Sequence, residues 1–176
     1  MKKLFALLLT LCLCFSAVAG FAADMNWADV EETAVGLAGE GQFYALNAFP
    51  LMYWIPNTMA YVEPDDSMLE IGILAYYQTE DETKFACAQY VDAEGAATLD
   101  MLNTVLADSG YGDIETNTVN GLTAVCGSNE TDGLVAAAFL TDDGNVLVFS
   151  FGYDPADETG AQVAVLICAS IQAVQQ

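Results

Sequence analysis

Residues 134–153, LVAAAFLTDDGNVLVFSFGY, contain two apolar runs on either side of a short polar turn. One run extends from Val135 to Leu140 and the other from Val146 to Phe151, and neither alternates with polar residues. Nearly continuous apolar runs of this length are typical of strands that are covered on both faces of a sheet. Asp143-Gly144 between them is a strong signal for a tight hairpin turn. We therefore expect an antiparallel hairpin inside a sheet that has a covering layer on each side.

More hairpins are expected on the N-terminal side of this segment. Asn120-Gly121 tolerates the positive φ that a two-residue hairpin turn requires. The acidic turn Glu80-Asp81-Glu82 separates two further strand-like segments, at residues 69–78 and 84–92. A four-stranded antiparallel meander is predicted at residues 114–119, 122–127, 134–141 and 145–153. Shorter extended pieces are expected at residues 42–46, 51–55 and 58–62.

Apolar residues at helical spacing predict three helices, at about residues 27–38, 97–108 and 157–173. Thr98 is suited to cap the middle helix, and Gly110 lies just beyond its end. These elements predict an α+β fold with a mainly antiparallel sheet of about six strands sandwiched by helices. We expect the C-terminal and middle helices on one face of the sheet and the N-terminal helix or loops on the other.

The N-terminus has the three regions of a secretory signal peptide. Lys2 and Lys3 precede an apolar run from Leu4 to Phe15, and small residues follow around Ala17-Val18-Ala19. The run is shorter than the roughly 20 apolar residues that span a bilayer. We therefore predict a cleavable signal peptide at residues 1–22, a single domain at residues 23–176, and a secreted, extracellular protein with no membrane insertion.

The chain is strongly acidic. Its 176 residues include 25 Asp and Glu, three Lys and Arg, and no His, which makes the formal net charge -22 at pH 7. Lys84 is the only basic residue beyond position 3. Nucleic acids and anionic lipids are bound through Lys and Arg, which displace counterions, so both classes of partner are disfavoured. A cationic partner is favoured, because long-range attraction steers it to this surface.

The lack of His and Arg in the mature chain also restricts its chemistry. Ser-His and Cys-His nucleophiles need an imidazole base, and no guanidinium group is present to clamp an anionic substrate. Carboxylate chemistry remains, such as the acid pair of a glycosidase, but the acidic residues cluster in predicted turns. We therefore predict a protein that is not an enzyme and that uses no cofactor, with a carboxylate-based hydrolase as an alternative.

The acidic turns also offer oxygen ligands to a hard cation. The candidates are Asp65-Asp66, Asp142-Asp143 with Asn145, and Asp154 with Asp157 and Glu158, and none matches an EF-hand loop. Asp and Asn in such positions also bond to nearby backbone amides in ordinary turns, which is the interpretation we favour. No metal ligand is therefore assigned, and a calcium-dependent module is kept as an alternative.

Three cysteines lie beyond the signal peptide: Cys87, Cys126 and Cys168. Cys87 and Cys126 can form a disulfide if their strands are neighbours. Free cysteines are also among the most buried residue types, and we favour burial for Cys168, which lies in a strongly apolar helix. The sequence leaves the redox state of the three thiols open.

Aromatic residues are dense between Phe43 and Tyr77. If Tyr53, Trp54 and Tyr76 are exposed together, they form a surface for docking a protein or stacking a carbohydrate, because aromatic side chains anchor interfaces. Such residues more often line the core of an edge hairpin. The three are therefore candidate partner-binding residues, with burial as the competing interpretation.

Five short motifs carry a resemblance to a known group of proteins. They are Phe49-Pro50, Trp54-Ile55-Pro56, Val119-Asn120-Gly121-Leu122, Phe149-Ser150-Phe151 and Ala169-Ser170-Ile171-Gln172. In this order they resemble small secreted bacterial proteins of unknown function with a PsbP-like fold. The resemblance implies a fold and an accessory or binding role rather than a shared catalytic centre, and it assigns no functional residue.

From the residues and the resemblance together, we expect a non-enzymatic accessory or binding domain that recognises a protein or a cell-envelope component. A calcium-dependent or carbohydrate-binding module is the first alternative, and the carboxylate-based hydrolase is the second.

Overall fold

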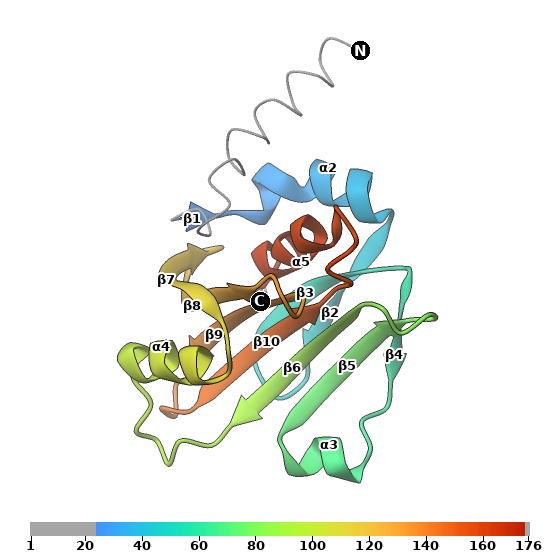
Figure 1. The fold of residues 1–176 in the computed structure, drawn as a ribbon. Coiled ribbons are helices and arrows are strands. Elements are labelled where there is room, and N and C mark those ends of the chain that lie inside the picture. The colour runs from blue at the N-terminus through green and yellow to red at the C-terminus, as the bar shows by residue number, and fades with distance from the viewer. Residues whose placement is uncertain (1–23, 175–176) are drawn as a thin grey trace.

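The computed structural model describes residues 24–174, which form two sheets and four helices (Figure 1). The helices are α2 (Trp27–Ala38), α3 (Asp66–Glu70), α4 (Leu99–Asp108) and α5 (Gly160–Ala169). The strands are β1 (Asp24–Met25), β2 (Gly41–Leu46), β3 (Leu51–Pro56), β4 (Met59–Val62), β5 (Ile73–Thr79), β6 (Phe85–Val91), β7 (Gly112–Val119), β8 (Leu122–Asn129), β9 (Leu134–Leu140), β10 (Val146–Gly152) and β11 (Gln172–Ala173). The predicted signal peptide at residues 1–22 lies outside the described residues.

The larger sheet has the strand order β1-β7-β8-β9-β10-β6-β5-β4, and the smaller sheet has the order β11-β3-β2. The predicted meander is confirmed, because β7, β8, β9 and β10 are consecutive antiparallel neighbours. Asn120 and Gly121, at φ 46° and 81°, form its first turn. The prediction of about six strands is too low, because the larger sheet has eight strands. β1 adds a parallel strand at one edge, and β4 adds an antiparallel strand at the other.

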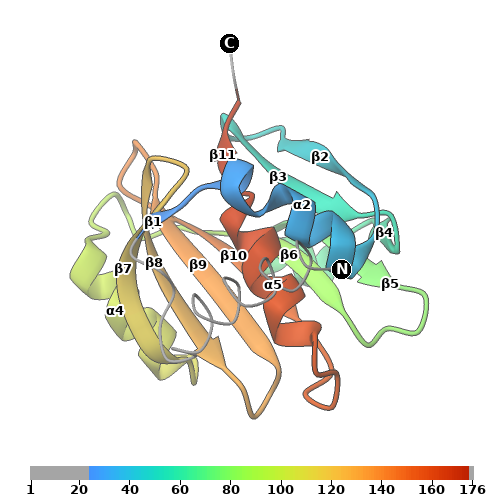
Figure 2. The ribbon, with the colours of Figure 1, turned by 90° about the horizontal axis from the view of Figure 1, so that it is seen from above.

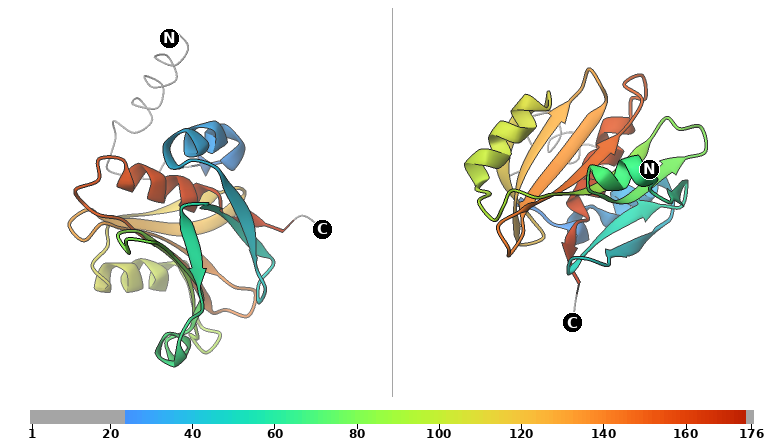
Figure 3. Two further views of the ribbon diagram at one scale, coloured as in Figure 1. Left: turned by 90° about the vertical axis from the view of Figure 1, so that its right-hand side faces the viewer. Right: turned by 90° about the horizontal axis from the view of Figure 1, so that it is seen from below.

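The central strands are covered on both faces, as their apolar runs predict. Alternate side chains of a strand point to opposite faces of a sheet. Phe149 of β10 belongs to the larger core cluster together with Ile167 of α5. Val148 points the other way and packs in a second cluster with Leu102 and Leu106 of α4. α4 and α5 therefore lie on opposite faces, as Figure 3 shows, and the prediction that they share a face is wrong.

The smaller sheet lies beside α5 on the same face of the larger sheet (Figure 2). Tyr53 of β3 contacts Tyr77 of β5 and Phe149 of β10, with ring centroids 6.1 Å and 5.2 Å apart. α2 forms the outermost layer and contacts α5. Its Trp27 packs on Trp54, with ring centroids 5.3 Å apart. In residues 24–174, no helix is both long and apolar enough to cross a membrane.

Two segments differ locally from the prediction. Residues 66–70, which overlap the predicted strand 69–78, form the short helix α3, because the carboxylate of Asp65 accepts a hydrogen bond from the backbone N–H of Met68 at 2.9 Å. α5 is shorter than the predicted residues 157–173. It ends before Ser170, and the chain then pairs with β3 as β11.

The side chain of Asn120 joins three segments that are far apart in the sequence. Its amide nitrogen donates to the carbonyl oxygens of Ala169 and Ile171, at 2.7 Å and 2.8 Å. Its amide oxygen accepts a hydrogen bond from the backbone N–H of Trp27 at 2.7 Å. One turn residue therefore fixes the end of α5 and the start of α2 to the β7–β8 hairpin.

Asn120→Gly is expected to lower the free energy of unfolding by about 2 to 4 kcal/mol, because glycine keeps the positive φ while three hydrogen bonds are lost. Urea denaturation measures this loss. Asn57→Gly, at an exposed turn position, is the matched control and is expected to cost no more than about 1 kcal/mol. Equal losses in the two variants would contradict a special role for the Asn120 side chain.

Candidate functional site

The three candidate aromatic residues do not share a surface. Tyr53 is 1% exposed and Trp54 is 3% exposed, so both belong to the core. Tyr76 is half-buried, pairs with Cys87 on the face opposite Tyr53, and stacks on Phe85 with ring centroids 5.8 Å apart. An aromatic docking surface made of these three residues is therefore wrong, and their burial in a hairpin core is the correct interpretation for Tyr53 and Trp54.

The suggested pairing of Cys87 with Cys126 is also wrong. Cys87 lies on β6 and Cys126 on β8, and both β9 and β10 run between them. Three strand spacings separate the two backbones by roughly 14 Å. Their side chains also point to opposite faces, because Cys126 packs in the larger core with Ala88, the neighbour of Cys87. A disulfide cannot span this separation.

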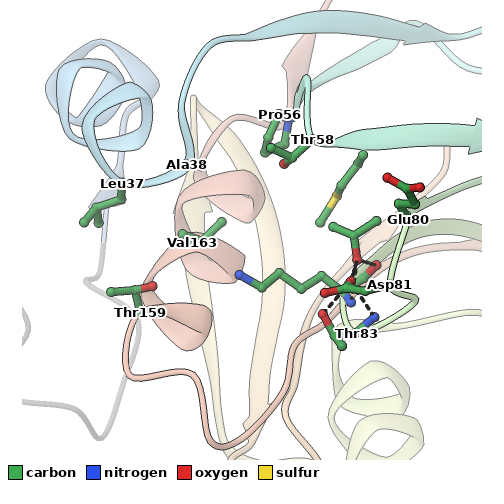
Figure 4. Close-up of a pocket in the computed structure, with 12 residues that line it drawn as sticks. Leu37, Ala38, Pro56, Thr58, Glu80, Asp81, Thr83, Thr159 and Val163 are labelled. Atoms are coloured by element: carbon green, nitrogen blue, oxygen red, sulfur yellow. Dashed lines mark hydrogen bonds between the residues drawn. The ribbon is translucent and has the colours of Figure 1, made fainter.

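A cleft of about 650 Å³ lies where four segments of the chain meet (Figure 4). These are the end of α2, the β3–β4 turn, the β5–β6 turn and the first residues of α5. Apolar walls are formed by Leu37, Met59 and Val163. The polar lining consists of Thr58, Thr79, Glu80, Asp81, Thr83, Lys84 and Thr159. The cleft combines apolar contact surface with hydroxyl and charged groups, and it is the candidate binding site.

Lys84 contributes the only cationic side chain that residues 24–174 contain. Its ammonium nitrogen lies 2.6 Å from a carboxylate oxygen of Asp157, in the turn before α5. Lys84, followed by the backbone N–H and the hydroxyl group of Thr159, lowers the pKa of Asp157 to about 2. The ion pair links the end of the β5–β6 turn to the turn before α5, and both segments border the cleft.

Asp81 organises the β5–β6 turn that forms the opposite wall. Its carboxylate accepts hydrogen bonds from the hydroxyl groups of Thr79 and Thr83, at 2.7 Å and 2.8 Å, as the dashed lines in Figure 4 show. The backbone N–H of Thr83 adds a third hydrogen bond at 3.2 Å. These donors lower the pKa of Asp81, led by the Thr79 hydroxyl group. The carboxylate therefore stays ionised at neutral pH.

The arrangement favours binding over turnover. A glycosidase needs one carboxyl group whose pKa is raised so that it can donate a proton. Among the described residues, every carboxyl group with a displaced pKa is lowered instead, because hydrogen-bond donors stabilise its ionised form: Asp65, Asp81, Asp143 and Asp157. Burial raises the pKa of the Cys87 thiol to about 11, which disfavours the nucleophilic thiolate.

Metal ligands are not gathered at the cleft. In the part of the chain that the structure describes, no group of three or more His, Cys, Asp or Glu side chains is arranged to hold a metal ion. The acidic turns instead use their carboxylates locally. Asp154 accepts a hydrogen bond from the backbone N–H of Ala156, and Asp157 accepts one from that of Thr159, both at 2.9 Å.

Comparison with known proteins identifies the fold. No protein-family model matches the chain, and no curated protein matches it. The solution structure of cyanobacterial PsbP (CyanoP) from Synechocystis sp. PCC 6803 is similar, with a TM-score of 0.54 over 79% of this chain and 95% of that chain. The chain has a PsbP-like α+β fold. The two sequences are 14% identical, so the PsbP-like architecture is shared and no cleft residue is transferred.

Sequence reasoning missed the cleft, because its lining comes from four segments that no single motif connects. Only one signal pointed to it. Lys84 is the sole basic residue beyond the predicted signal peptide, and it is the first residue of the predicted strand 84–92, just after the acidic turn. In the structure this cation forms an ion pair with Asp157.

Trp54→Ala is expected to lower the free energy of unfolding by about 3 to 5 kcal/mol, because it leaves a cavity beside Trp27. Tyr61→Ala is the matched control, since Tyr61 is 55% exposed, and is expected to cost no more than about 1 kcal/mol. Thermal and urea denaturation measure both. A stable Trp54→Ala protein would show that the side chain does not support the core.

The Lys84–Asp157 pair makes a pH-dependent contribution. The pKa of Asp157 is lower in the folded protein than its ordinary 3.8, so the stabilisation is present above that value and is lost as the pH falls through about 2. Lys84→Met is expected to cost no more than about 1 kcal/mol near neutral pH, since the pair is partly exposed.

The difference in the free energy of unfolding between wild type and Lys84→Met should shrink as the pH falls from 3.8 through about 2, because Asp157 becomes protonated over this range. Urea denaturation across this range measures it. A difference that stays constant down to the lowest pH would show that Lys84 stabilises the fold without Asp157.

Proposed function

We propose that this protein is a secreted, non-enzymatic binding domain that recognises a protein or a cell-envelope component through the cleft between α2, α5 and the β5–β6 turn. The single observation that supports the proposal most is the cleft itself. It is about 650 Å³ in volume and brings apolar walls, threonine hydroxyl groups and ionised side chains together. Such a surface matches an extended polypeptide segment, which presents apolar side chains, backbone amides and charges at close spacing.

The charges of the lining favour a segment that carries positive charge. Glu80 and Asp81 contribute two carboxylates, while the ammonium group of Lys84 is paired with Asp157. Glu80 is exposed, and it is available to a cationic group of a partner. The 25 acidic residues of the chain extend the attraction beyond the cleft, because uncompensated charge accelerates the encounter with an oppositely charged partner.

Neither alternative function has comparable support from the geometry. A carbohydrate-binding surface required Tyr53 and Trp54 at the surface, and both are buried. A hydrolase requires two carboxyl groups that face each other across an enclosed site, whereas Glu80 and Asp81 are neighbours on one turn. A calcium-dependent module requires several converging oxygen ligands. The acidic turns use these oxygens to accept hydrogen bonds from their own backbone.

Site-specific photo-crosslinking in the producing bacterium tests the proposal. A benzophenone amino acid at Thr58, on the cleft wall, is expected to capture one partner that mass spectrometry identifies. The matched control places the same amino acid at Thr104, an exposed position on α4 outside the cleft. Equal capture at the two positions would contradict recognition through the cleft.

Affinity measurements with the purified partner then test the chemistry. Two variants are expected to weaken binding at least about tenfold each. Thr58→Trp narrows the cleft from an exposed position, and Glu80→Lys inverts a charge of the lining. Thr104→Trp should leave the affinity unchanged. Added salt should weaken binding of the wild type, because the attraction is electrostatic. Salt-independent binding that tolerates Glu80→Lys would refute a cationic ligand.

A further inference from the structure

Two of the three buried cysteines meet inside the core. Cys126 lies on β8 and Cys168 on the last turn of α5, and both are 0% exposed. Both belong to the larger core cluster, on the face of the sheet that α5 covers. Both are free thiols in the structure, and a hydrogen bond with the side chain of Cys126 is the leading cause of the raised pKa of the Cys168 thiol.

Small side chains on both elements allow this close approach. Cys126 is paired with Ala137 on β9, and Ala124 lies two residues earlier on the same face of β8. On the helix, Ala164 is one turn before Cys168 and is also buried. Larger residues at these positions would hold the helix further from the sheet. The Asn120 amide, which binds the carbonyl oxygen of Ala169, fixes the helix end beside Cys168.

We propose that Cys126 and Cys168 form a disulfide that links α5 covalently to the central sheet. Cys87 takes no part, because it lies on β6 and on the opposite face of the sheet. The bond would close the loop of residues 126–168, which contains β9, β10 and most of α5. It would restrict the unfolded chain and stabilise the native state. The pairing requires neither the cleft nor its ligand.

The reaction consumes a disulfide oxidant, such as oxidised glutathione or an oxidised protein dithiol. The thiolate of one cysteine attacks a sulfur of the oxidant and displaces one thiolate, which leaves a mixed disulfide. The thiolate of the second cysteine then attacks the sulfur of the first cysteine and displaces the second thiolate of the oxidant. The pair loses two protons and two electrons, and the oxidant gains them.

Oxidation is expected before α5 completes its docking. In the folded protein both thiols are shielded from an oxidant, and the pKa of Cys168 lies well above its ordinary value, so its thiolate is scarce. In the unfolded chain the same thiols are exposed and ionise more readily. Once formed, the bond is protected from external thiols by the same burial.

Thiol counting after refolding tests the pairing. The full chain, with Cys12→Ser and Cys14→Ser so that only three thiols remain, is unfolded, refolded in oxidised and reduced glutathione, and alkylated under denaturing conditions. The expected product carries one alkyl group, on Cys87, and yields a crosslinked Cys126–Cys168 peptide on proteolysis. Three alkylated cysteines in a refolded protein, or a crosslink that includes Cys87, would overturn the proposal.

Stability provides a second measurement on the same protein. Reduction is expected to lower the Tm by about 5 to 15 °C, because the loop of residues 126–168 is released. Cys126→Ala and Cys168→Ala should each abolish this redox-dependent shift, while Cys87→Ala should preserve it. If the alanine variants fail to fold, the thiol count of the parent chain decides the question alone. An identical Tm for the oxidised and reduced parent would refute a stabilising bond.

Discussion

The amide group of Asn120 is the interaction on which the arrangement of the outer layers depends. It lies in a hairpin turn of the larger sheet, yet its three hydrogen bonds are made to the start of α2 and to the end of α5. These two helices supply Leu37 and Val163 to the cleft. A displacement of either helix would therefore change the shape of the candidate site. The stability of one turn and the geometry of a distant cleft are connected through two helices.

Packing on both faces of β8, β9 and β10 explains why the chain needs two separate covering layers. The residues of β9 from Val135 to Phe139 are all buried, and alternate ones face α5 and α4. Three successive alanines, at positions 136–138, leave space for a helix to approach closely on either side. The smaller sheet, which contains β3, covers the larger sheet beyond α5 as far as β5, where Tyr53 packs against Tyr77.

Local patterns in the sequence were sufficient to predict the hairpins, the boundaries of α2 and the need for cover on both faces. They could not show which helix covers which face, because residues such as Val148 and Phe149 are equally apolar and attract either helix. The edge strand β1 could not be predicted from the sequence either, because it has only two residues and therefore no periodic pattern. Trp54 and Tyr76 could not be assigned to core or surface from their chemistry. The cleft arises only when four separate segments converge.

The acidic composition and the proposed binding role have a common physical basis. Hydrogen-bond donors lower the pKa of Asp81 and Asp157, so these carboxylates remain charged across the neutral range. A carboxylate that stays ionised provides a constant negative field and is a poor proton donor near neutral pH. Lys84 forms an ion pair with Asp157, and the side chains of Glu80 and Asp81 line the cleft. The carboxylates that are poor proton donors are therefore the ones that would attract the proposed cationic partner.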